Sequence, residues 1–118
     1  MLTVHTLASG SEGNCLLLSG GGVHLLVDAG ISARRITASL RELGLSPQDV
    51  TAVLLTHEHT DHTAGLATLT KQYRLPLYAS DGTAAALALR CPALRDVLHP
   101  IPRQYTFSLG DVDITVFP

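Results

Sequence analysis

Short apolar segments separated by turn residues make up the first quarter of the chain. Residues 2–7, 15–18 and 23–27 are such segments, and small or polar residues fill the gaps at 9–14 and 19–22. Short apolar runs bounded by Gly, Ser and Asn are typical of β-strands. We therefore predict three strands here, the second and third forming a hairpin.

The apolar spacing then changes to that of a helix. Ile36, Leu40 and Leu43 recur at i, i+4 and i+7 and form one apolar stripe. Ser32 is a suitable N-cap and Gly44 a suitable residue just past the C-terminus, which predicts a helix over 33–43. The other expected elements are helices at about 63–73 and 81–90 and strands at 50–56, 76–79, 105–109 and 112–117.

Strands that alternate with helices predict an α/β layered domain. The strand at 50–56 carries an uninterrupted apolar run at 53–55, which is typical of a strand buried on both faces. His99 lies between prolines, and we expect a loop there.

Composition narrows the class of protein. The chain has 118 residues, a formal net charge of −2 and 46 % hydrophobic residues, which fits one folded domain and excludes a disordered chain. No apolar run approaches the ~18–20 residues of a membrane span, and the first residues lack a signal-peptide pattern. Cys15 and Cys91 are far apart in sequence, so we expect free thiols and a cytoplasmic location. The near-neutral net charge argues against a membrane partner.

Four potential metal ligands follow the strand at 50–56 within six residues: His57, His59, Asp61 and His62. In an extended segment, residues i and i+2 project to the same side about 6–7 Å apart, so His57 and His59 converge on one ion. Asp61 and His62 are directed to an adjacent position once the chain turns into the helix. Two divalent ions, Zn²⁺ or Mn²⁺, are therefore predicted, as in many hydrolases. A solvated His-rich loop is the alternative.

Three motifs in this chain resemble those of a known family. The H-x-H-x-D-H pattern at 57–62, with Gly65 and Leu66 after it, resembles the signature of the metallo-β-lactamase fold superfamily, and V-D-A-G at 27–30 resembles its earlier aspartate motif. The S-G-S-x-G-N pattern at 9–14 resembles the YycJ/WalJ-type branch, bacterial metal-dependent hydrolases linked with DNA phosphodiester cleavage. The resemblance implies the N-terminal half of an αββα sandwich, a mixed β-sheet with flanking helices.

The resemblance also implies roles for individual residues. His57 and His59 would bind the first metal, and Asp61 and His62 the second. A hydroxide between the ions would attack the scissile phosphorus or carbonyl, and Asp61 would orient it or take its proton. Asp28 would not bind a metal itself but would hold the segment that carries the ligands. The alternative is that Asp28 is a simple turn carboxylate.

The segment 9–14 has two open interpretations. Ser9, Ser11 and Asn14 would present hydroxyl, amide and backbone N–H groups to a phosphate. A tight structural turn explains the same residues equally well.

The superfamily's pattern continues with a further His, a bridging Asp and a last His, and this sequence does not contain them. The resemblance therefore predicts that residues 1–118 form a single domain corresponding to the N-terminal part. Our first hypothesis is a metal-dependent phosphodiesterase or nuclease acting on nucleic acid or a small phosphodiester.

Two other functions stay open, and a third is disfavoured. One is a non-catalytic, truncated metal-binding or dimerisation module, and another is a hydrolase of thioesters or other small esters. A β-lactam hydrolase in the narrow sense is disfavoured because the chain lacks a signal-peptide pattern. A homodimer would cover the apolar sheet face that half a sandwich exposes.

Overall fold

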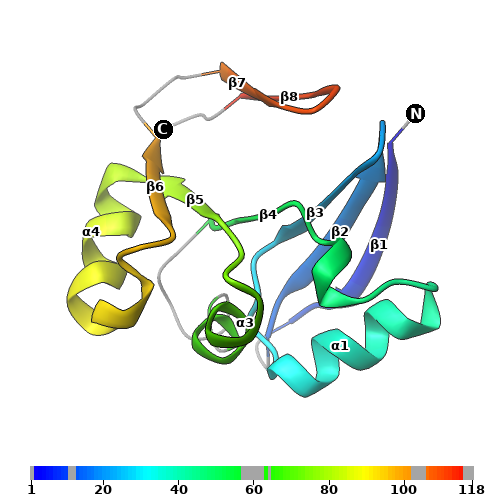
Figure 1. Ribbon diagram of the computed structural model, residues 1–118, viewed down its shortest axis with the longest axis horizontal. Helices are drawn as coiled ribbons and strands as arrows, with labels where there is room; N and C mark the ends of the chain where they lie inside the picture. Colours follow the sequence, from blue (N-terminus) through cyan, green and yellow to red (C-terminus); the bar gives the residue numbers. More distant parts are fainter. Residues whose placement is uncertain (1, 11–12, 57–62, 64, 102–105, 116–118) are drawn as a thin grey trace.

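The computed structural model describes residues 2–10, 13–56, 63, 65–101 and 106–115 (Figure 1). In this part of the chain, one sheet has the strand order β1-β2-β3-β4-β5-β6, and a hairpin forms a second, two-stranded sheet. The sheet strands are β1 (Thr3–Ala8), β2 (Cys15–Gly20), β3 (Val23–Val27), β4 (Ala52–Leu54), β5 (Leu77–Ser80) and β6 (Leu98–Ile101). The hairpin strands are β7 (Thr106–Leu109) and β8 (Val112–Thr115). The helices are α1 (Ala33–Glu42), α3 (Leu66–Tyr73) and α4 (Asp81–Arg90), with 3₁₀ turns η1 (Pro47–Asp49) and η2 (Pro92–Leu94).

The sheet is mixed, and its two halves differ in strand direction. β1, β2 and β3 are antiparallel neighbours, whereas β3, β4, β5 and β6 run parallel. The predicted mixed sheet with flanking helices is therefore confirmed. The parallel half brings the carboxyl ends of β3 and β4 side by side, which is where α/β folds place their ligand sites.

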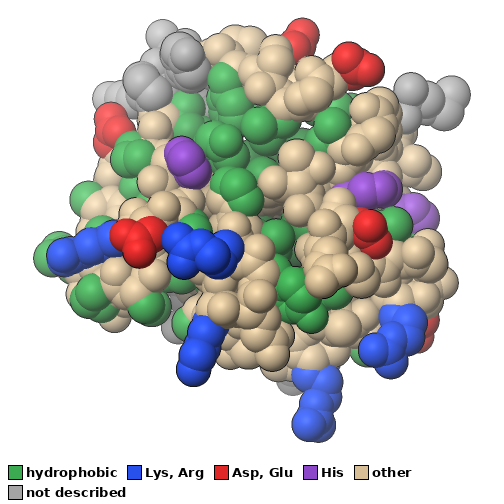
Figure 2. All heavy atoms as spheres, viewed as in Figure 1, with side chains coloured by type: hydrophobic (Ala, Val, Ile, Leu, Met, Phe, Trp, Pro, Cys, Tyr) green, Lys and Arg blue, Asp and Glu red, His purple; other side chains and the backbone are tan. Residues whose placement is uncertain are grey.

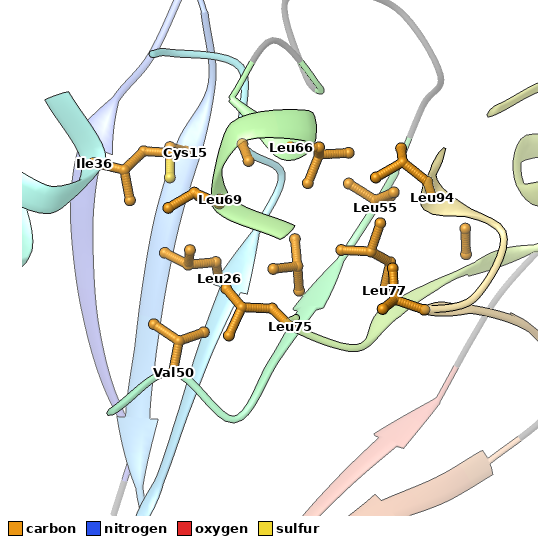
Figure 3. Close-up of a cluster of buried hydrophobic side chains, with 14 of the residues drawn as sticks. Cys15, Leu26, Ile36, Val50, Leu55, Leu66, Leu69, Leu75, Leu77 and Leu94 are labelled. Atoms are coloured by element: carbon orange, nitrogen blue, oxygen red, sulfur yellow. The ribbon is translucent and has the colours of Figure 1, made fainter. Parts of the chain in front are cut away.

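The main hydrophobic core lies between the sheet and the helices (Figure 3). Ile36 and Leu40 of α1 and Leu66 and Leu69 of α3 are fully buried against it. Burial of these side chains, each worth about 1.5–3 kcal/mol, holds the helices on this face. The strand residues of this cluster include Cys15, Leu17, Leu26, Val53, Leu77 and Ala79.

The opposite face of the sheet carries a second, smaller cluster. Val23, Leu25 and Ala52 are buried there, and side chains of the β7–β8 hairpin pack against them. Figure 1 shows the hairpin on the side of the sheet away from α1 and α3, and Figure 2 shows hydrophobic side chains gathered in the upper middle of the same view. β4 is apolar on both faces, as predicted, because Val53 belongs to the first cluster and Ala52 to the second. The apolar face that we expected to be bare is thus partly covered by the hairpin.

The ends of α1 agree with the sequence signals. The Ser32 hydroxyl accepts a hydrogen bond from the backbone N–H of Arg35 at 3.2 Å. Gly44 follows the helix with φ +78°, and Leu45 N–H donates to Leu40 O at 2.9 Å, which is the Schellman arrangement. Leu43 departs from the predicted stripe and is 38 % exposed, because the helix ends before it.

The prediction of a loop around His99 is wrong. This segment is β6, which pairs in parallel with β5, with Tyr78 opposite His99 and Ala79 opposite Pro100. β6 is the edge strand of the sheet, and proline is tolerated in an edge strand because one side of the strand needs no hydrogen-bond donor. No helix in the described residues is long and apolar enough to cross a membrane.

Candidate metal centre

Asp28 connects the ends of β3 and β4. It has φ +63°, a left-handed conformation that Asp adopts more readily than most residues, and only 5 % of it is exposed. Its backbone N–H donates to Leu54 O at 2.7 Å. Its carboxylate accepts two hydrogen bonds from Thr56: the backbone N–H at 2.8 Å to Oδ1 and the hydroxyl at 2.7 Å to Oδ2. Hydrogen bonds to a carboxylate are about twice as strong as neutral ones, so Asp28 fixes the residue that precedes His57.

The segment 28–30 also holds the other two motifs. The N–H of Gly30 donates to Asn14 O at 2.9 Å, and the N–H of Gly65 donates to Ala29 O at 2.8 Å. Three motifs that are far apart in sequence thus meet at the carboxyl ends of β3 and β4. Both the residue before the segment 57–62 and the glycine shortly after it are anchored to the same three residues.

Two glycines make this close approach feasible. A Cβ at Gly65 would collide with the carbonyl oxygen of Ile31, and one at Gly13 would lie 2.6 Å from Gly30 O. Gly13 also has φ +150°, which side-chain-bearing residues rarely adopt. The glycines at 13 and 65 are therefore required by packing of one motif on another.

The predicted metal ligands His57, His59, Asp61 and His62 lie outside the described residues, as does Ser11. Among the described residues, no group of three or more His, Cys, Asp or Glu side chains could hold a metal ion. The four ligands stay predictions, and the structure describes the scaffold on both sides of them.

The side chain of Asn14 forms hydrogen bonds with the backbone of Gly10, within the 9–14 segment. The side chain of Asn14 accepts a hydrogen bond from Gly10 N–H at 3.3 Å and donates one to Gly10 O at 3.2 Å. These contacts favour the structural-turn interpretation for Asn14, whereas Ser9 is exposed at the surface. A phosphate-binding role of this segment stays a prediction.

Burial and a neighbouring charge keep the Cys15 thiol neutral. Cys15 is completely buried in the core. Burial first, and then the negative charge of Asp28, raise its pKa from 9.0 to about 12. Cys15 is thus an inert packing residue beside the site, and Cys91 is likewise a free thiol, as expected.

The other histidines in the described part of the chain lie on strands β1, β3 and β6. His5 is half-buried in β1, and His24 in β3 has its Nδ1 2.8 Å from the Ser19 hydroxyl. His99 in β6 is exposed and stacks on Tyr78. Our interpretation of these three as surface or packed residues agrees with their positions.

Sequence reasoning missed Thr56 as the partner of Asp28. Its place directly before the His-rich motif, at the end of a buried strand, is the signal that could have indicated it. The pairing itself spans 28 residues, so no local pattern reveals it.

Comparison with known proteins places the chain within a family. The family model described as the metallo-beta-lactamase superfamily matches residues 8–114. Exodeoxyribonuclease WalJ of Streptococcus pneumoniae serotype 2 is 40 % identical over 115 residues, covering 94 % of this chain and 42 % of the relative. Exodeoxyribonuclease YycJ of Bacillus anthracis is 40 % identical over 108 residues, covering 90 % and 38 %. Ribonuclease TTHA0252 of Thermus thermophilus is 35 % identical over 103 residues, covering 86 % and 23 %.

Solved structures agree on the fold. A B3 metallo-beta-lactamase with an active-site glutamic acid matches with a TM-score of 0.77 at 23 % identity, covering 95 % of this chain and 47 % of its own. The Rm3 metallo-beta-lactamase matches with a TM-score of 0.75 at 26 % identity and the same coverage. The chain thus spans less than half the length of the relatives and structures it matches.

Proposed function

Because the chain belongs to the metallo-beta-lactamase superfamily, we propose that it carries the first metal-ligand segment of a metal-dependent hydrolase that cleaves phosphodiester bonds in nucleic acid. The observation that carries the proposal is the anchoring of the segment 57–62. Thr56 and Gly65, on either side of it, are both hydrogen-bonded to residues 28–30. Thr56 directly precedes the predicted ligands and Gly65 follows them after two further residues, so the described residues on both sides of the ligands are held by the same loop.

The donor set fits two divalent ions. Three imidazoles and one carboxylate within six residues are ligands for Zn²⁺ and equally for Mn²⁺. Gly65, three residues after this segment, packs so closely on Ile31 that a Cβ would collide with the Ile31 carbonyl oxygen. We propose His57 and His59 for one ion and Asp61 and His62 for the other.

The chemistry that such ions supply when bound is a hydroxide nucleophile at neutral pH and stabilisation of the charge that develops on the phosphate oxygens. Asp61 is the chain's own candidate to orient the nucleophile or to hold its proton. Asp28 would act as a positioning residue, because its carboxylate holds Thr56, the neighbour of His57.

A nucleic-acid substrate is supported by the relatives. Two of them are named exodeoxyribonucleases and a third is named a ribonuclease. A cytoplasmic location belongs to the same proposal, and the free thiols of Cys15 and Cys91 are compatible with a reducing compartment. Homodimerisation over the sheet face also stays a proposal, for the part of that face that the hairpin leaves open.

The alternative with specific support is a non-catalytic metal-binding module. The segment 57–62 offers four ligating side chains, which is two for each of the two proposed ions. An ion held by two side chains has fewer protein ligands than the three of ordinary catalytic zinc sites.

The test is metal content measured together with hydrolysis. Metal per chain is determined by plasma mass spectrometry after dialysis against Zn²⁺ or Mn²⁺, and hydrolysis is followed on labelled single-stranded DNA, on RNA and on a small phosphodiester. We expect bound metal and metal-dependent cleavage in the wild type, and loss of both in His57→Ala.

The control is His5→Ala, which removes a histidine from the far edge of the sheet and should change neither. Metal binding without cleavage of any substrate would support the non-catalytic module instead. Less than a tenth of an ion per chain, together with no cleavage, would refute the proposal. A cleavage rate that does not depend on added metal would refute it as well.

A further inference from the structure

Three aromatic rings form a stack on the sheet face that the hairpin covers. The rings of Tyr78 and His99 have centroids 4.9 Å apart and planes 20° apart, and those of Tyr78 and Phe107 have centroids 5.0 Å apart and planes 24° apart. Tyr78 comes from β5, His99 from β6 and Phe107 from β7, so the stack joins the sheet to the hairpin. Tyr78 is half-buried and also packs against the second cluster.

His99 is the exposed member of this stack. β6 is the last strand in the order of the sheet, so His99 lies on the edge strand, with Tyr78 of β5 as its inner neighbour. Figure 1 shows β6 beside β5. A planar ring that is backed by a second ring and exposed to solvent is the arrangement on which proteins stack unpaired bases.

The stack lies on the side of the sheet that leads to the ligand segment. Tyr78 is opposite Leu54 and His99 is opposite Tyr78, so all three residues project from the same face. Thr56 lies two residues after Leu54, directly before His57. Two strand spacings of about 4.8 Å separate His99 from Leu54, the last residue of β4, so the two lie roughly 10 Å apart. At a rise of about 3.4 Å per stacked nucleotide, this is a span of about three nucleotides.

We propose that His99 is a stacking platform for an unpaired base of a single-stranded nucleic-acid substrate, a few nucleotides away from the bond that is cleaved. The inference rests on the proposed function, since it names a binding position for the same substrate. Stacking uses the flat face of a base, so the position would accept any base and would be insensitive to sequence. DNA and RNA share this chemistry, and the two are separated by testing both.

The experiment measures binding rather than cleavage. Anisotropy of a labelled oligothymidine with hydrolysis-resistant phosphorothioate linkages is measured with the wild type, His99→Ala and His99→Tyr, and with His5→Ala as the matched control. A second oligomer lacks the bases, and a third is oligouridine. Loss of one stacked base through the alanine substitution should weaken binding of the base-bearing strands to His99→Ala by about five-fold to 160-fold.

The other variants and the abasic strand show whether lost stacking is the cause of the weaker binding. His99→Tyr, which keeps a flat ring, and His5→Ala should bind like the wild type. The wild type and His99→Ala should bind the abasic strand with equal affinity. The imidazole proton signal of His99 in an NMR titration should move upfield when the base-bearing strand is added and stay in place with the abasic strand.

Failure of the inference is distinguishable from failure of the proposed function. If the wild type binds the strands and His99→Ala binds them equally well, the platform is refuted while the nuclease proposal stands. An equal loss on the abasic strand would also refute it, because the contact would then be with the backbone. If the wild type neither binds nor cleaves DNA or RNA, both fail. Preference for oligothymidine over oligouridine would assign the platform to DNA, and the reverse to RNA.

Discussion

Replacing Gly65 by alanine tests the close contact on which the candidate site is built. Gly65 has φ −88° and ψ −5°, a conformation that alanine adopts without strain. The cost of the new methyl group is therefore purely steric. It would collide with the backbone carbonyl oxygen of Ile31 and lie 3.1 Å from Ile36 Cδ1. The side chain of Ile36 can move aside, whereas the carbonyl belongs to the loop that follows residues 28–30 and cannot.

The size of the effect follows from this clash. Forcing a methyl group into a packed interior costs about 1–3 kcal/mol. Alanine also lowers the conformational entropy of the unfolded chain, which offsets about 0.4–1 kcal/mol of this cost. We expect the free energy of unfolding to fall by about 1–2 kcal/mol, which for a domain of this size lowers Tm by about 4–8 °C. Metal affinity should fall too, because Gly65 anchors the end of the segment 57–62.

Gly82 provides the matched control. It lies in α4, and a Cβ there would meet no atom within 4 Å. Gly82→Ala should therefore raise the free energy of unfolding by about 0.5–1 kcal/mol through helix propensity. Thermal unfolding followed by circular dichroism compares the two variants with the wild type. The reasoning is refuted if both substitutions stabilise the protein, or if Gly65→Ala leaves Tm unchanged.

Three further predictions concern the same region and its surroundings. Asp28→Ala should lower the free energy of unfolding in urea by about 2–4 kcal/mol, since Thr56 loses two hydrogen bonds and alanine is strained at φ +63°; a loss below about 0.5 kcal/mol would contradict this. The raised pKa of Cys15 means that the unfolded chain loses its thiol proton first, so its contribution to stability is complete below pH 9 and declines between pH 9 and about 12. The urea midpoint of the wild type should therefore fall more steeply over this range than that of Cys15→Ala, and equal slopes would argue against it. Finally, if a homodimer covers the open part of the sheet face, analytical ultracentrifugation at micromolar concentration should give the molar mass of a dimer. A molar mass of a monomer would exclude this dimer.

Secondary structure was largely predictable because its signals are local. The stripe of Ile36 and Leu40, the Ser32 cap and the glycine at 44 define α1 within a dozen residues. The one strand that was missed, β6, contains a proline whose tolerance depends on the strand's place at the sheet edge. That place is a property of the whole sheet and leaves no mark in the neighbouring residues.

The sequence by itself indicated the chemistry that we propose for this protein. Three histidines and an aspartate within six residues predict a metal-ligand segment, and three motifs indicate the superfamily, to which the chain belongs. These motifs are defined by residue type and by spacing along the chain, and the sequence alone contains both.

Only the tertiary structure decided how the motifs meet. It pairs Asp28 with Thr56 across 28 residues, seats Gly65 on Ile31, and stacks His99 on Tyr78. These contacts arise because parallel strands bring their carboxyl ends to one edge and because β5 and β6 pair side by side, with Tyr78 opposite His99. They depend on long-range packing, in which the free energy of each contact is available only after the whole sheet has formed.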